Sequence, residues 1–160
     1  MNIAEKLQKG IAEKEQYEKL VKKLKKADKR KVDTVFHDLH DSTFQKIDCL
    51  GCANCCKTTS PIFRDTDIKR LAKRLKMKEA AFIDQYLHLD NEGDYVLNSS
   101  PCSFLDHQNY CMVYEDRPLA CREYPHTNRK NMYQILSLTR KNMEICPGVS
   151  HIMEEILRKF

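Results

Sequence analysis

The sequence predicts an α+β fold, in the form of one small, mostly helical domain with a short antiparallel β-sheet. Its 160 residues, 41% of them hydrophobic and 32% charged, are enough for one hydrophobic core. Apolar residues recur at three- and four-residue steps along most of the chain, which is the helical period. One stretch, residues 91–97, instead has turn residues followed by a strand-like Tyr-Val-Leu.

The amino-terminal residues 1–40 are predicted to form a basic helical arm, and residues 41–160 a separate domain. Helical periodicity begins at Ile3 and continues through residues 17–24, then resumes from Val32 to Ile47. The arm carries 11 Lys or Arg against 7 Asp or Glu, so most of the chain's net charge of +5 lies there. The basic stretch 22–31 has no interleaved aromatics and is accompanied by acids at Asp28 and Asp33, which favours a solvated helix face over a nucleic-acid interface.

The elements after residue 60 follow from caps, turns and prolines. Thr66 is expected to cap a helix that carries Asp67 in its first turn, and a second short helix contains Phe82. A hairpin is expected around residues 91–97, and a second one around the polar tip 106–109.

Three helices are expected after this second hairpin. A brief helix starts at residues 116–118 and stops at Pro125, because proline is tolerated in a first turn and ends a helix later. Thr127 is expected to cap a longer helix, and residues 149–160 form the closing amphipathic helix.

Residues 49–56, with the sequence CLGCANCC, place four cysteines within eight residues. A CxxC step lets two sulfurs reach one ion, and Gly51 is expected to supply the backbone freedom for the tight curl. Side chains of neighbouring residues in an extended segment point in opposite directions, so Cys55 and Cys56 are expected to serve two centres or two metals of one cluster. Such a spacing is improbable as packing and indicates a metal site.

Four more cysteines follow, for a total of eight, which gives capacity for one or two centres of zinc or iron–sulfur type that would cross-link the domain. Across the second hairpin, Cys102 and Cys111 are expected to share one face. The thiolate of Cys121 is expected to be favoured by its helix amino terminus and by Arg122. The grouping of thiols into sites stays open. The predicted metal ligands are Cys49, Cys52, Cys55, Cys56, Cys102, Cys111, Cys121 and Cys146.

Other candidates are weaker. His107 and His126 are possible extra ligands or proton carriers, but a lone histidine near a turn is usually polar surface. Glu115 and Asp116 form a possible carboxylate pair for a transferable ion. The glycine motifs of nucleotide-binding loops are absent, and no catalytic residue is assigned.

The order of the cysteine motifs resembles the zinc- or iron-chelating cysteine-cluster family, often called the YkgJ family. The similarity covers about residues 48–148 and rests on CxxCxxCC followed by PCSFL, YEDRP, CREYP and Cys146-Pro147. The resemblance implies a bacterial cytoplasmic metalloprotein. A related cysteine motif occurs in the flagellin lysine methylase, a larger iron–sulfur enzyme.

We therefore expect a cytoplasmic metal-binding protein that serves in metal handling, sensing or electron transfer. The charged amino terminus and the lack of a long apolar run favour the cytoplasm over secretion or a membrane. One alternative is an iron–sulfur enzyme, either an oxidoreductase or a protein methyl transferase. Another is a zinc-stabilised module that meets nucleic acid or protein through the basic arm. The expected partners are metal ions, with a protein as a further candidate; nucleic acid and membranes are not expected.

Overall fold

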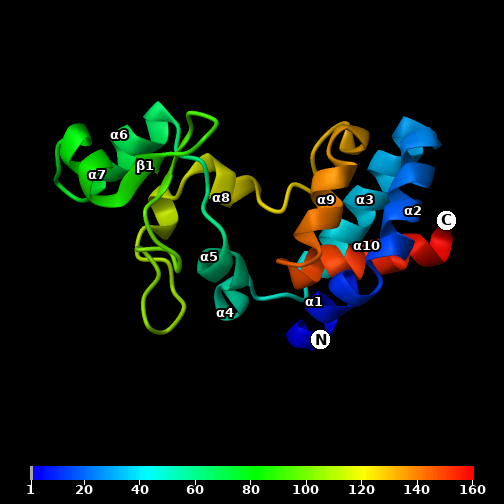
Figure 1. Cartoon of the computed structure of the whole chain (residues 1–160). Coiled ribbons are helices and arrows are strands. Elements are labelled where there is room, and N and C mark those ends of the chain that lie inside the picture. Colours follow the sequence, from blue (N-terminus) through cyan, green and yellow to red (C-terminus); the bar gives the residue numbers. More distant parts are fainter. Residues whose placement is uncertain (1) are drawn as a thin grey trace. The chain divides into compact units, whose positions relative to one another are not determined.

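The computed structural model describes residues 2–160 and is built mainly from helices (Figure 1). Helices make up 61% of it, and its sheet has two antiparallel strands, which confirms the predicted α+β class. The chain forms two compact units, one from residues up to Asp48 together with Pro125–Phe160, the other from Cys49–Tyr124. We call them the helical unit and the cysteine unit. The predicted division at residue 40 stays a prediction.

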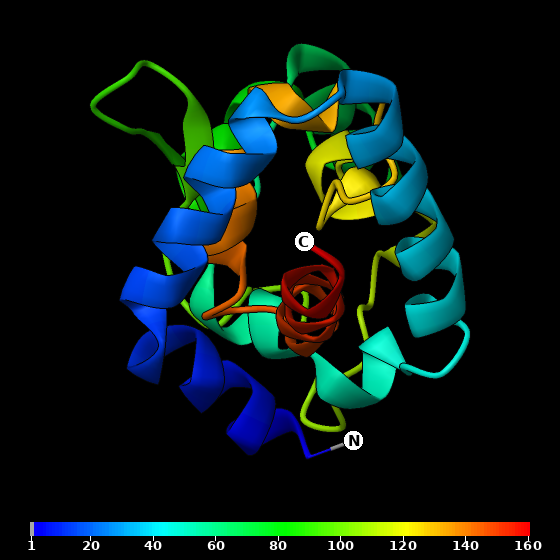
Figure 2. The same cartoon turned by 90° about the vertical axis from the view of Figure 1, so that its right-hand side faces the viewer.

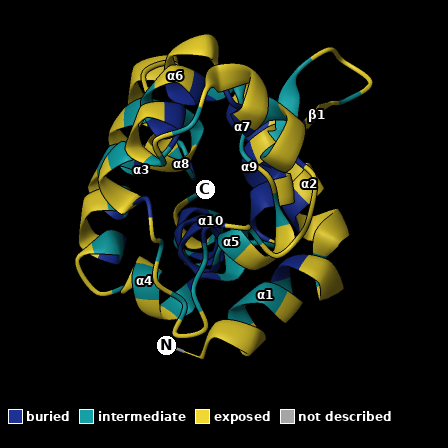
Figure 3. Ribbon diagram, turned by 90° about the vertical axis from the view of Figure 1, so that its left-hand side faces the viewer, coloured by how far each residue is buried: buried dark blue, intermediate teal, exposed yellow. Residues whose placement is uncertain are grey.

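The helical unit is built around its carboxyl-terminal helix, which contacts α1, α2, α3 and α9 (Figure 2). This helix, α10, is almost wholly buried over its first ten residues and appears dark blue in Figure 3. The basic residues within 22–31 of the arm are all exposed, on helices whose other faces meet the core of this unit. The elements of the unit are α1 (Ile3–Ala12), α2 (Lys14–Lys26), α3 (Lys29–Phe44), η2 (Met132–Gln134), α9 (Leu136–Asn142) and α10 (Pro147–Lys159).

One hydrophobic core joins all of these helices except α1, and it contains the apolar positions expected from the periodicity. Tyr17, Phe36 and Ile152 are completely buried within it. Helix α1 is joined to α10 by polar contacts instead: Lys9 forms an ion pair of 2.7 Å with Glu154, and Lys6 pairs with the same carboxylate. The apolar faces of α2 and α3 thus pack them into the core, whereas α1 is attached to α10 through the carboxylate of Glu154, more than 140 residues away in the sequence.

Thr127 does not cap a helix, contrary to the prediction. Its hydroxyl is buried and lies 2.8 Å from Nδ1 of His40, so a tertiary hydrogen bond uses the group that would have served as the cap. Asn131 has a φ of 61°, in the left-handed region, and the helical backbone begins only after it. The predicted long helix is therefore a short 3-10 turn followed by α9.

The cysteine unit contains shorter elements and the only β-sheet found in residues 2–160. Strands β1 and β2 pair Leu87 with Leu97, as the predicted turn requires. Gly93, with a φ of 81°, occupies a turn position that other residues rarely adopt. The second predicted hairpin is reduced to one bridge between Leu105 and Cys111. The elements are α4 (Cys49–Cys52), α5 (Asn54–Thr58), α6 (Asp65–Arg74), α7 (Glu79–Tyr86), β1 (Leu87–Leu89), β2 (Tyr95–Leu97), η1 (Tyr114–Asp116) and α8 (Leu119–Glu123).

This unit has a hydrophobic core of its own, formed by α6, α7, the hairpin and the segment 104–113. Phe82 is completely buried, and its ring lies parallel to that of Phe104 at a centroid distance of 6.1 Å. Cys102 and Cys111 pack against this core. In the part of the chain that the structure describes, no helix combines the length and apolar character needed to cross a membrane.

Candidate metal centre

The segment with four cysteines folds as two short helices separated by one left-handed residue. That residue is Ala53, which has a φ of 48° and is buried, so the expected curl occurs here and not at Gly51. The Ala53 amide donates to the carbonyl of Cys49 at 2.8 Å, which closes the first turn. Cys55 and Cys56 lie in helix α5. The prediction that they point in opposite directions was wrong, because successive side chains in a helix are about 100° apart.

Backbone contacts bring the second group of cysteines to the end of α5. The amide of Cys102 donates to the carbonyl of Cys56 at 2.8 Å, and the Ser100 hydroxyl donates to the carbonyl of Lys57 at 2.7 Å. Cys111 is joined to the same loop by its bridge to Leu105. Two loops far apart in sequence thus carry Cys56, Cys102 and Cys111 into one neighbourhood.

Cys121 approaches this neighbourhood from helix α8. Burial, together with the charges of Cys56, Cys102 and Cys111, raises the pKa of its thiol to about 12, although Arg117 acts in the opposite direction. The residue as a whole is exposed, so the raised pKa reflects the protein packed around the sulfur and not complete enclosure. The expectation that the helix terminus and Arg122 favour the Cys121 thiolate was wrong, because removal of the sulfur from water dominates.

The other three thiols show the same mutual influence. A hydrogen bond from the Cys55 thiol lowers the pKa of Cys56 to about 7, against the opposing effect of burial. Burial raises the pKa of Cys102 and of Cys111, and the charge of Cys56 adds to both effects. The charge of Cys56 therefore acts on Cys102 and Cys111, and the charges of all three act on Cys121. We call these four residues the four-thiol cluster.

The sulfurs do not converge on a single point. Across residues 2–160, no three His, Cys, Asp or Glu side chains are placed so that they could hold one ion. Of the other predicted ligands, Cys49 and Cys52 are in α4 and Cys55 is in α5. Cys146 lies in the helical unit, where it is the residue before α10 and packs against the core of that unit.

The weaker candidates lie elsewhere or are engaged in other contacts. His107 is exposed in the turn after Asp106, and His126 belongs to the helical unit. Asp116 forms an ion pair of 2.9 Å with Arg74, so this carboxylate joins η1 to α6. Glu115 is exposed, and its carbonyl accepts a hydrogen bond from Arg122.

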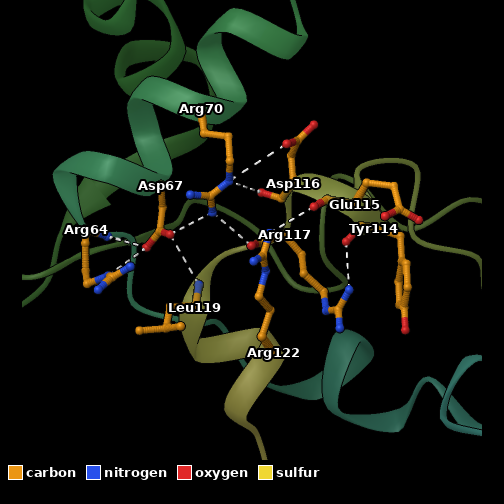
Figure 4. Close-up of polar contacts among 9 residues, drawn as sticks. All are labelled: Arg64, Asp67, Arg70, Tyr114, Glu115, Asp116, Arg117, Leu119 and Arg122. Carbon is orange, nitrogen blue, oxygen red and sulfur yellow. Dashed lines mark hydrogen bonds and ion pairs between the residues drawn. The ribbon is translucent and has the colours of Figure 1, made fainter.

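Sequence reasoning missed the part played by Asp67, which was expected only to favour the dipole of its own helix. Its side chain is completely buried and accepts a hydrogen bond of 3.2 Å from the amide of Leu119, the first residue of α8 (Figure 4). The two residues are 52 positions apart. No local pattern in the sequence indicates such a contact.

The fold and the neighbouring thiols define a small, cysteine-rich α+β protein of the metal-binding class. The family model described as CxxCxxCC, putative zinc- or iron-chelating domain, matches residues 48–147, and the chain belongs to this family. The match confirms the predicted resemblance and supports metal binding. No curated protein and no solved structure matches the chain.

Proposed function

We propose that the cysteine unit takes up and releases a thiolate-bound metal through the four-thiol cluster, in metal handling. The proposal is supported by the way three separate segments bring four cysteines together: the Cys102 amide bonds to the Cys56 carbonyl, the bridge to Leu105 holds Cys111 in the same loop, and the charges of these three thiols act on Cys121. Cysteine thiolates are the ligands preferred by Zn²⁺ and by iron–sulfur clusters. Cys56, Cys102, Cys111 and Cys121 would hold the metal, and the remaining four cysteines stay predicted ligands.

The chemistry of the donor set fits a cation. Thiolates that lie close together repel one another, and burial disfavours each charge further. A bound Zn²⁺ or iron centre would supply the positive charge that allows all four to be deprotonated. Arg117 already acts on Cys111 and Cys121 in this direction, but one guanidinium cannot compensate four negative charges.

Two features favour handling over permanent structural zinc. The cysteine unit has an apolar core that includes Phe82, Phe104 and Leu71, so its fold does not depend on metal alone. The thiols of the cluster are half-buried or exposed, which leaves a path for a ligand from solvent or from another protein. A site that is both open and supported by an independent core is suited to exchange.

An iron–sulfur cluster with a role in electron transfer is the second candidate, and one observation favours it. The four sulfurs influence one another but do not converge on one ion. A four-iron cluster is larger than a single ion, because each cysteine binds a different iron. Such a spread is compatible with a cluster, whereas a zinc site requires the sulfurs to move closer together.

The test is anaerobic purification of the full chain, followed by elemental analysis, an absorption spectrum and native mass spectrometry. A colourless protein with stoichiometric zinc supports the zinc form, and a brown protein with iron and sulfide supports the cluster. Replacement of all four residues of the cluster by serine should abolish the bound metal, whereas Ser103→Ala, beside Cys102, should retain it. A wild-type protein that binds neither metal would contradict the proposal.

A further inference from the structure

One helix holds the whole chain segment between two of the proposed ligands. Residues 112–120 connect Cys111 to Cys121, and helix α6 contributes three side chains that bind this segment, two of which, Asp67 and Arg70, are drawn in Figure 4. These side chains are Asp67, Arg70 and Arg74, and we call them the α6 anchor. They lie on one face of the helix because they are spaced by three and four residues.

Asp67 is the buried centre of the anchor. One carboxylate oxygen, Oδ1, accepts from the Leu119 amide at 3.2 Å and from Nη2 of Arg70 at 2.8 Å. The other, Oδ2, accepts from the amide of Arg64 at 2.9 Å and from its Nε at 3.4 Å. The carboxylate is therefore shared between the start of α6 and the start of α8, which carries Cys121.

The two arginines bind the chain on the Cys111 side. Arg70 donates to the carbonyl of Asp116 at 3.1 Å and to that of Arg117 at 3.0 Å. Arg74 donates to the carbonyl of Met112, next to Cys111, at 3.1 Å and pairs with the Asp116 carboxylate at 2.9 Å. The two guanidinium groups thus bind three backbone carbonyls between residues 112 and 117.

We propose that Asp67 is a positioning residue of the metal centre, which acts through the Leu119 amide to place Cys121 relative to Cys111. This inference rests on the proposed function. Hydrogen bonds to a buried carboxylate are stronger than neutral ones and are directional, so the anchor limits the positions that α8 can adopt. A preformed spacing reduces the ordering that metal binding must otherwise impose, and partners one step removed from the ligands commonly change metal affinity by about 10–100-fold.

The main competing explanation is that Asp67 serves only to stabilise α6. Its Oδ2 belongs to a capping box with Arg64, so Asp67→Asn would weaken the helix as well as the anchor. A substitution at the other end of the contact avoids this problem. Leu119→Pro removes the amide N–H that donates a hydrogen bond to Asp67, and it leaves every contact within α6 in place.

Position 119 is suitable for proline. It is the first residue of α8, where proline is tolerated, and Pro118 before it has a ψ of 150°, the extended conformation that a following proline requires. Leu119→Ala is the matched control, because it removes the side chain but keeps the amide. Asp65→Asn, at an exposed acid in the same first turn of α6, is the control for Asp67→Asn.

The experiment is a titration of the reduced, metal-free full chain with Co²⁺, followed by the thiolate–cobalt absorption bands and by zinc displacement. Leu119→Pro and Asp67→Asn should bind Co²⁺ about tenfold more weakly than the wild type, with weaker visible bands because the ligands are less ordered. Leu119→Ala and Asp65→Asn should bind like the wild type. Thermal unfolding of the metal-free proteins separates a loss of affinity from a loss of fold.

Equal affinities for Leu119→Pro and Leu119→Ala would overturn the inference while leaving the proposed function intact. A wild-type protein that shows no thiolate–cobalt bands would instead overturn the proposed function, and the inference with it. If Leu119→Pro fails to fold, Asp67→Asn compared with Asp65→Asn decides the question, and thermal unfolding of the metal-free variants measures the effect of the weakened capping box. The Asp67 variant should weaken Co²⁺ binding by more than its loss of stability explains, and the Asp65 variant should bind like the wild type.

Discussion

The helical unit and the cysteine unit are each stabilised internally by a different kind of contact. The helical unit has a core of large, completely buried side chains, including Tyr17, Phe36 and Ile152. The cysteine unit has shorter helices and a smaller core, and its segment 112–119 is fixed by hydrogen bonds from the α6 anchor to the backbone. Apolar packing dominates the first unit, and polar contacts to the backbone are prominent in the second.

This difference has a physical reason. Apolar packing stabilises a chain by covering it, and covered thiols cannot meet a ligand from solvent. Hydrogen bonds with the side chains of the α6 anchor, of which only Asp67 is completely buried, hold a segment at a few points and leave the rest of its surface open. The cysteine unit can therefore place Cys111 and Cys121 without enclosing them. Four predictions test this comparison.

The largest effect on stability is expected from the core of the helical unit. Phe36→Ala should lower the free energy of unfolding by about 3–5 kcal/mol, because it removes a completely buried ring and leaves a cavity. Chemical denaturation followed by circular dichroism measures this change. Leu138→Ala, at a leucine that is 45% exposed, is the control and should change the free energy by less than about 0.5 kcal/mol. Similar losses for both variants would show that the packed core of this unit is not its main support.

The cysteine unit should respond through metal affinity. Cys56→Ser is expected to weaken metal binding by at least about 100-fold. Residues one step removed from a metal change its affinity by about 10–100-fold, and the loss of a direct ligand should cost at least as much as the upper end of that range. Cys56 interacts with all three other members of the four-thiol cluster, whereas Cys146 packs against the core of the helical unit. A chelator competition should therefore show a larger loss for Cys56→Ser than for Cys146→Ser. The reverse order would argue against the four-thiol cluster as the binding site.

The third prediction concerns acid stability of the helical unit. Burial alone would raise the pKa of Glu154, but hydrogen bonds and charges from Lys6 and Lys9 lower it to about 2. A lowered carboxyl pKa stabilises the fold above the ordinary value near 4.5, and this contribution is lost as pH falls from there toward 2. The contribution is of the order of 2–3 kcal/mol at neutral pH.

Glu154→Gln should remove this contribution, so its unfolding free energy should depend less on pH below 5 than that of the wild type. Glu155→Gln is the matched control, because its carboxylate pairs with the exposed side chain of Arg158. The measurement is urea denaturation at a series of pH values. Parallel pH profiles for wild type and Glu154→Gln would contradict the assignment of Lys6 and Lys9 as its stabilising partners.

The smallest effect is expected at a close approach inside the helical unit. A Cβ at Gly148 would lie 2.6 Å from the ring of Phe44, closer than atoms can pack, so the ring must move. Gly148→Ala should therefore destabilise the fold by about 1–2 kcal/mol, as overpacking does. The double variant with Phe44→Leu should recover part of this loss in thermal unfolding. Additive losses in the double variant would show that the ring is not the obstacle.

Much of the secondary structure could be predicted because its causes are local. The apolar spacing in residues 17–24 produces a buried helix face wherever that helix packs, and Gly93 marks a turn regardless of its surroundings. The end of α8 before Pro125 follows from the chemistry of proline. A prediction failed where a residue distant in sequence takes the hydrogen bond expected to be local. His40 bonds to the hydroxyl of Thr127, which was expected to cap a helix.

The candidate site shows the same division. The CxxCxxCC spacing singled out four cysteines as candidate ligands because it is improbable as packing, and their role as ligands stays a prediction. Their pKa values were not predictable, since the pKa of Cys121 depends on burial and on three thiols from other segments. The expected divergence of Cys55 and Cys56 failed because those residues are helical, and nothing in a short cysteine run distinguishes a helix from an extended chain.

The amino-acid sequence by itself therefore determined the fold class, the positions of most helices, one hairpin and the residues that mark the chain as a member of its family. Only the tertiary structure decided which thiols act on one another and which side chains hold them in place. The reason is the range of the forces: helical periodicity and turn chemistry act over a few residues. The contact between Asp67 and Leu119 joins positions 52 residues apart and exists only after the chain has folded.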